Sequence, residues 1–147
     1  MTIAFEIAVN ALLGVLLWAL LRQRRADEPR LSGEEEALAL FRRRYPVAAG
    51  RATLSAEAQG ALIELQDGRI GLLQRHGRRW NARMLEARDV SACTLGPDDS
   101  LQLQLADFGW PRARLRLAEP ATRAAWAARL AAQSRAAQPG PRATRHA

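Results

Sequence analysis

The stretch ALIELQDGRIGLLQR, residues 61–75, decides the fold that we expect for this chain. It contains two short apolar runs joined by Asp67-Gly68, a dipeptide that favours a tight turn between antiparallel strands. Short apolar runs between turn residues are typical of strands that lie in a core. The stretch therefore predicts a β-hairpin within an antiparallel sheet.

Further strands are predicted downstream of this hairpin. HGRRWNARML, residues 76–85, adds a second turn at Gly77 and a strand in which Trp80, Ala82 and Met84 share one face. DVSACTL, residues 89–95, predicts a fourth strand that ends at the turn GPDDS. LQLQLAD and RARLRLA alternate strictly, which indicates two more strands with one buried and one wet face. The residues expected inward are Leu101, Leu103, Leu105, Ala113, Leu115 and Leu117, and those expected outward are Gln102, Gln104, Arg112, Arg114 and Arg116.

The last predicted element is a helix in EPATRAAWAARLAAQ, residues 119–133, with Pro120 near its first turn. Thr122, Trp126 and Leu130 form its inward ridge, and Arg129 is expected to face water. We expect Trp126 to insert among Leu103, Leu115 and Trp80. The fold class is therefore α+β: about six antiparallel strands, forming a sheet or partial barrel, capped by a C-terminal helix.

The N-terminal segment predicts a membrane anchor. The apolar run from Ile3 to Leu21 would span about 28 Å as a helix, close to the thickness of the hydrocarbon layer. A cleaved signal peptide would carry basic residues before the run, whereas here they follow it as RQRR. A soluble core helix would need a largely apolar partner in the chain, and none is evident. The positive-inside rule places the N-terminus outside and the rest in the cytoplasm of a cell with an inner membrane.

Three residues of this span, Glu6, Asn10 and Gly14, recur every four positions and share one face with Trp18. A carboxyl, an amide and a glycine on one face suit close contact between membrane helices, which would also allow a homo-oligomer. The alternative is that Glu6 reaches the headgroups, Asn10 is tolerated and Gly14 is incidental.

A second helix is predicted in residues 32–46, after a basic linker. Ser32 and Glu35 have the spacing of a capping box, and Leu38, Phe41 and Tyr45 share a face. The Arg42, Arg43 and Arg44 run either contacts anionic lipid or complements the helix dipole in solvent. Residues 50–60 are expected to be a connector with one helical turn in SAEAQ.

Composition argues against most kinds of chemistry. The chain has 147 residues, a net charge of +7, one Cys and two His, and all its basic residues are Arg. No phosphate-binding loop, nucleophile–base set or metal-ligand spacing is present, so we expect no enzyme activity, no cofactor and no metal site. Asp98 and Asp99 are expected to form a turn, and Cys93 to be a small core residue. Nucleic acid is disfavoured as a partner because exposed aromatics are not interleaved with the arginines.

The order of strands followed by a helix with an inward Trp126 resembles a pleckstrin-homology-like (PH-like) domain, small bacterial versions of which are attached to membrane helices. The resemblance covers about residues 61–133 and implies seven strands, one more than the sequence indicates. It also implies an anionic-lipid contact for the loop arginines Arg75, Arg78 and Arg79, against the simpler interpretation that charge keeps this turn solvated. DGRIGLLQRHGRRW and AAWAARL further resemble a family of small proteobacterial inner-membrane proteins. That family has two spans, so its toxin-like or respiratory-assembly roles are not transferred.

The sequence thus predicts five parts: an anchor (1–21), a basic linker (22–31), a juxtamembrane helix (32–46), a PH-like domain (52–133) and a disordered tail (134–147). The function expected is a single-pass interaction module that docks a protein partner at the inner membrane face. One alternative is an anionic-lipid-binding module. Another is a small membrane-bound regulator or toxin-like protein.

Overall fold

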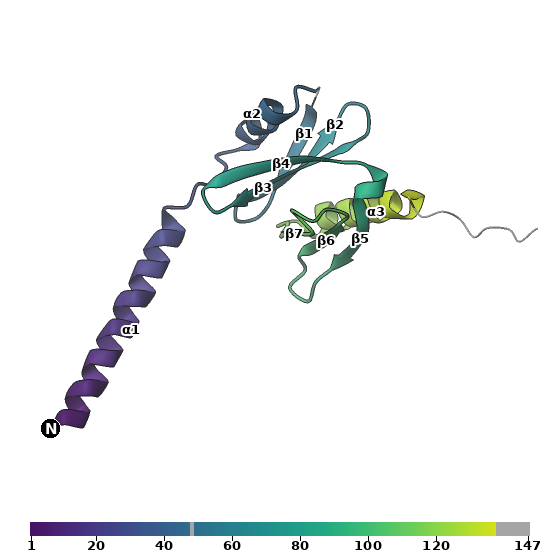
Figure 1. The fold of residues 1–147 in the computed structure, drawn as a ribbon. Coiled ribbons are helices and arrows are strands. Elements are labelled where there is room, and N and C mark those ends of the chain that lie inside the picture. The colour runs from purple at the N-terminus through teal and green to yellow at the C-terminus, as the bar shows by residue number, and fades with distance from the viewer. Residues whose placement is uncertain (48, 138–147) are drawn as a thin grey trace, which may run out of the picture.

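The computed structural model describes residues 1–47 and 49–137. Two helices come first, α1 (Thr2–Ala26) and α2 (Glu34–Arg44). Four strands follow: β1 (Ala49–Leu54), β2 (Gly60–Leu65), β3 (Ile70–His76) and β4 (Arg79–Leu85). A 3-10 turn, η1 (Ala87–Asp89), leads to β5 (Val90–Leu95), β6 (Leu101–Leu105), β7 (Arg112–Leu115) and the helix α3 (Pro120–Ala137). Figure 1 shows α1 projecting as a single rod from the folded remainder.

The predicted hairpins are confirmed. Strands β2 and β3 pair antiparallel through Leu62↔Leu72, and β3 pairs with β4 through Leu73↔Ala82. Their turns contain Gly68 and Gly77 at φ of 86° and 62°, left-handed values that a residue with a Cβ adopts only under strain. The order β1-β2-β3-β4 makes this sheet, sheet A, a meander.

Sheet A is buried on both faces, which explains its nearly continuous apolar runs. One face packs against α2, where Phe41 contacts the side of the sheet that carries Ile63 and Leu73. The other face, with Leu62 and Leu72, packs against the second sheet and α3. Trp80, Ala82 and Met84 do share a face, and it is the face that α2 covers.

The second sheet, sheet B, has the order β5-β6-β7 and is also antiparallel. The predicted alternation is confirmed: Leu101, Leu103, Leu105, Ala113, Leu115 and Leu117 are buried, and the three arginines between them are exposed. Burial of alternate residues on one face is what packs sheet B onto sheet A.

Helix α3 packs along β5 and η1, and its buried residues are Trp126, Leu130 and Ser134. Trp126 joins the core that contains Leu103 and Leu115, as expected. The expectation for Trp80 was wrong, because β4 turns that side chain toward α2 and into the other core. Thr122 is only half-buried, and its hydroxyl lies 3.1 Å from Glu119 Oε2.

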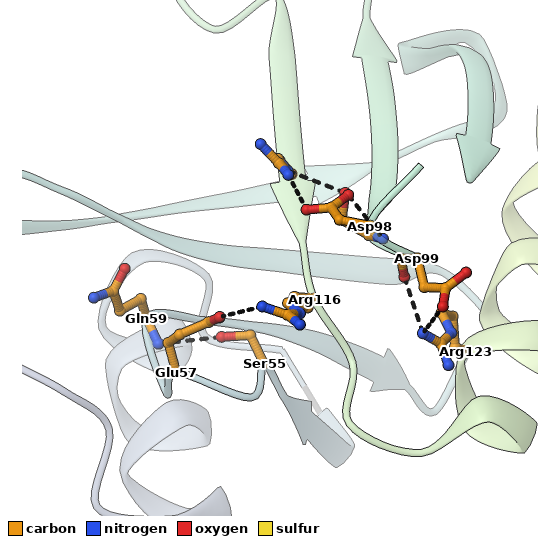
Figure 2. Close-up of polar contacts among 9 residues, drawn as sticks. Ser55, Glu57, Gln59, Asp98, Asp99, Arg116 and Arg123 are labelled. Carbon is orange, nitrogen blue, oxygen red and sulfur yellow. Dashed lines mark hydrogen bonds and ion pairs between the residues drawn. The ribbon is translucent and has the colours of Figure 1, made fainter. Parts of the chain in front are cut away.

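The strand count of six was too low, since residues 1–47 and 49–137 contain seven strands, which form two separate sheets and no closed barrel. The missing strand is β1, which lies where we expected a connector. Its register shifts between Ala49 and Ala52, and this irregularity removes the alternation that would reveal a strand. The expected helical turn in SAEAQ is instead a turn in which Ser55 Oγ accepts a hydrogen bond from the backbone N–H of Gln59 at 3.1 Å (Figure 2). Ser55 Oγ also accepts one from the backbone N–H of Gly60 at 3.2 Å.

The start of α2 also differs from its prediction. Gly33 is the N-cap, and Glu36, not Glu35, accepts bonds from the backbone and hydroxyl of Ser32 at 2.7 and 2.6 Å. These bonds hold the pKa of Glu36 below its ordinary value. The apolar face of α2 is as predicted, with Leu38 and Phe41 buried and Tyr45 partly buried.

Candidate functional site at the base of the N-terminal helix

No side chain of helix α1 is buried against the described part of the chain. The helix is long and apolar enough to cross a membrane, and its most apolar stretch of 18 residues has a mean hydropathy of 2.1. It continues past the apolar run, so the arginines of RQRR are helical. Near the end of the apolar run, the guanidinium of Arg22 lies 5.1 Å from the centre of the Trp18 ring.

One ion pair joins the segment after α1 to the folded part. Arg75 Nη2 donates to Glu28 Oε2 at 2.6 Å, and Arg75 Nη1 donates to the carbonyl of Gly77 at 2.9 Å. The Arg75 side chain is only 9% exposed, so this guanidinium is held in place. The hydrogen bond from Arg75 holds the pKa of Glu28 below its ordinary value, and the charges of Arg25 and Arg30 act in the same direction.

The same end of sheet A carries the turn between β1 and β2, and that turn also contacts the linker. The backbone N–H of Leu31 donates to the carbonyl of Ala58 at 2.8 Å. A hollow of about 400 Å³ lies between the end of α1 and the β3–β4 turn, lined by Arg24, Asp27, Glu28, Gly77 and Arg78. Both turns at this end of the sheet therefore lie close to the base of α1 (Figure 1).

The base of α1 gathers exposed arginines, which we call the basal arginines: Arg24, Arg25, Arg30, Arg78 and Arg79. None of them forms an ion pair with a carboxylate of residues 1–47 or 49–137. Of the loop arginines singled out from the sequence, Arg78 and Arg79 are thus exposed, whereas Arg75 is engaged with Glu28. Sequence patterns could not separate these roles because Glu28 is distant along the chain.

Arg42, Arg43 and Arg44 are exposed at the end of α2. The Arg44 guanidinium lies 5.5 Å from the centre of the Tyr45 ring. Arg44, Tyr45 and Trp80 line a hollow of about 500 Å³ beside β4. Arg44 therefore lies near Trp80 at the start of β4. Trp80 directly follows the basal arginine Arg79 in the sequence.

A groove of about 510 Å³ runs along β1 and α3. Sequence patterns did not reveal it because β1 was not predicted. Its lining residues include Thr53, Leu54, Ala125 and Trp126. Trp126 Nε1 donates to Thr53 Oγ1 at 3.1 Å, which ties the helix to the strand. The N–H of Ala52, on the outer edge of β1, donates to Glu34 Oε1 at 2.9 Å.

Several carboxylates around sheet B form ion pairs with arginines. Figure 2 shows Arg116 directed at Glu57, 3.8 Å away, and Arg123 at Asp99, 3.6 Å away. Asp98 accepts a 2.7 Å hydrogen bond from the Ser100 hydroxyl and pairs with Arg114. Bonds from Ser100 and Arg114 lower the pKa of Asp98 to about 2. Two of the three arginines in the outward stripe of sheet B are therefore paired, which weakens the case for phosphate tracking.

The remaining reactive side chains lie apart from one another. His76 is exposed and meets the ring of Trp110 edge-on, with centroids 5.0 Å apart. Cys93 is partly buried in β5, and burial raises the pKa of its thiol. Over residues 1–47 and 49–137, no three His, Cys, Asp or Glu side chains gather closely enough to hold a metal ion.

Comparison with models of known protein families, with curated proteins and with solved structures gives no match.

Proposed function

We propose that this chain is a single-pass membrane protein whose folded part is an interaction module held at the cytoplasmic face of the inner membrane, where it docks a protein partner. The observation that carries the proposal is that α1 contributes no buried residue to either core. An exposed apolar helix of this length needs lipid or a protein to cover it. The folded part, in contrast, contains both of its cores within residues 31–134.

The attachment between α1 and the module supports a fixed orientation. The Glu28–Arg75 pair holds the β3–β4 turn at the base of α1, and the Leu31–Ala58 hydrogen bond holds the β1–β2 turn there. With α1 in a bilayer, the basal arginines would lie at headgroup level, where anionic lipid attracts them. The positive-inside rule assigns this arginine-rich side to the cytoplasm.

The groove along β1 and α3 is the surface that we propose docks the partner. It combines an outer strand of a sheet with the apolar side chains of Leu54 and Trp126, a combination that suits an extended segment of another protein. The groove is also lined by charged residues that include Glu34, Glu119, Arg51 and Arg129. Their charges would set specificity for charged side chains of the docked segment.

A second candidate function is contact with anionic lipid through the module itself, which the unpaired Arg78 and Arg79 favour. The order of seven strands in sheets of four and three, followed by a helix with a buried Trp126, agrees with the PH-like resemblance and supports this candidate as well. We keep PH-like membership as part of the proposal.

Orientation is tested by fusing a fluorescent reporter and, separately, a phosphatase that is active only in the periplasm to Ala147. We expect fluorescence without phosphatase activity. The reverse pattern would place the module outside and would rule out the proposed cytoplasmic partner.

Docking is tested by photo-crosslinking in intact membranes from a photoreactive residue at Arg51, with Gln104 on sheet B as the comparison position. We expect a discrete crosslinked protein from position 51 alone. Ala125→Arg, which fills the groove, should abolish it, whereas Ala128→Arg on the exposed side of α3 should not. A crosslink that survives Ala125→Arg would exclude the groove as the docking surface.

The lipid candidate is tested with residues 27–137, which retain both cores, and with vesicles of phosphatidylcholine with or without phosphatidylglycerol. Binding that requires phosphatidylglycerol and is lost in Arg78→Glu/Arg79→Glu, but not in Arg135→Glu, would favour lipid. Absence of binding to either vesicle would remove that candidate.

A further inference from the structure

Two polar side chains of α1 have no partner in the described part of the chain. Asn10 lies about 10 Å inside the apolar run that starts at Ile3, and Glu6 lies one turn before it. Both are exposed, and neither makes a hydrogen bond or an ion pair with residues 1–47 or 49–137. An amide without a partner in hydrocarbon costs free energy, so a group from outside this chain is needed to bond it.

We infer that α1 pairs with α1 of a second copy of this chain, through the face that carries Glu6, Asn10 and Gly14. This inference depends on the proposed insertion of α1 in a membrane but not on the proposed docking groove. It identifies a partner for the helix, whereas the proposed function concerns the module.

The chemistry of Asn10 favours an identical partner over a different one. All copies of the chain insert with the same orientation, so two paired α1 helices are parallel and place Asn10 of each at the same depth. A carboxamide has both donors and an acceptor, so two of them can bond each other reciprocally across a two-fold axis. No second kind of polar residue is needed to satisfy either one.

The shape of the face agrees with close approach. Gly14 lies one turn after Asn10 and adds no side chain to this face of the helix. A glycine at the point of contact lets the backbones of two membrane helices come together. Helix geometry places Leu17 within the same face and Leu13 at its border, and places Leu12 and Leu16 away from it.

Association is measured on the full chain in membranes of phosphatidylcholine and phosphatidylglycerol, by energy transfer between labelled copies at varied protein-to-lipid ratio. Asn10→Leu removes the reciprocal hydrogen bonds and should weaken association by about threefold to thirtyfold. Gly14→Leu should weaken it at least as much, whereas Ala8→Leu, on the opposite face, should leave it unchanged. Reporter fusions at Ala147 would show whether each variant is still inserted, which separates failure of this inference from failure of the proposed span.

Disulfide crosslinking supplies a second measurement on a background that carries Cys93→Ala. Cysteines at Leu13 or Leu17 should form crosslinked dimers, and those at Leu12 or Leu16 should form few. The double variant Asn10→Leu/Leu12→Asn keeps the composition but moves the amide to the far side, and should shift the crosslinks toward positions 12 and 16. Equal crosslinking at all four positions, or association unaffected by Asn10→Leu in an inserted chain, would overturn the inference.

Discussion

Arg129 Nη1 lies 2.6 Å from Glu64 Oε1, and the central carbon of the Arg129 guanidinium lies 5.2 Å from the centre of the Trp126 ring. The residue that the sequence placed in water thus connects α3 to β2 and covers the buried indole. The helical spacing was correct that Trp126 and Leu130 face inward. It could not show that the β2–β3 turn extends far enough to meet the flank of α3, where Arg129 Nη2 also reaches the carbonyl of Gly68 at 3.3 Å.

Arg129→Ala should therefore lower the free energy of unfolding of residues 27–137 by about 0.5–1.5 kcal/mol, since it removes a partly exposed ion pair and a cation–π contact. Urea denaturation measures this loss. A double-mutant cycle with Glu64→Gln should give a coupling of about 0.2–1 kcal/mol that decreases in high salt. A coupling of zero would mean that the pair seen here contributes nothing in solution.

Trp126→Ala should be far more damaging, because it empties space in the core shared by both sheets. Truncation of a buried tryptophan costs about 3–5 kcal/mol, a large part of the stability of a domain of this size. Trp126→Phe keeps most of the volume and loses mainly the hydrogen bond to Thr53, so we expect about 1–2 kcal/mol. Arg135→Ala, an exposed change on the same helix, should stay within about 0.5 kcal/mol. Thermal melts that fail to rank the three variants in this order would show that α3 is not docked through Trp126.

Sequence patterns predicted most of the fold because its strands are either strictly alternating, as in Leu101 to Leu105, or bounded by Gly turns, as at Gly68 and Gly77. They missed β1, because Gly50 and Arg51 interrupt the alternation of apolar and polar residues in this strand. Its identity as a strand is evident only from its pairing with β2. They also could not reveal that α2 covers the outer face of sheet A, since the long apolar runs of β2 and β3 are compatible with any covering element.

The candidate site was predictable only in part. Exposure of Arg78 and Arg79 follows from their place in a turn, but the role of Arg75 depends on Glu28, which approaches only in the folded chain. The groove along β1 and α3 depends entirely on the missed strand. In contrast, the stripe of Glu6, Asn10 and Gly14 was visible from spacing alone, because a single helix fixes which residues share a face.

Stability at acid pH should depend on Asp98. Its pKa is lowered from 3.8 to about 2 by the hydrogen bond from Ser100 and by Arg114. The folded state therefore binds fewer protons than the unfolded state, so the stabilisation is complete above about pH 4 and is lost as pH falls toward 2. The difference in stability between the natural chain and Asp98→Asn should shrink across this window, measured by urea denaturation at each pH. Ser100→Ala should shift the loss to higher pH, and a difference that is constant from pH 5 to pH 2 would contradict the assignment.

The packing of α2 on sheet A is tested at Gly71, the point of closest approach. A Cβ added to Gly71 would lie 2.6 Å from Phe41 Cζ and 3.3 Å from Ile63 Cβ, both too short for an undisturbed contact. Gly71→Ala should therefore displace Phe41 and cost about 1–3 kcal/mol of unfolding free energy. Gly109→Ala serves as the control, because a Cβ there meets only the flexible Asp107 carboxylate at 3.6 Å, and it should be nearly neutral. Phe41→Leu removes the ring atoms that clash, so the double variant Gly71→Ala/Phe41→Leu should be more stable than the sum of the single losses predicts, by about 1 kcal/mol or more. Strictly additive losses would mean that α2 does not lie over β3 as the structure has it, and that the hydrophobic face of α2 is covered by something other than sheet A.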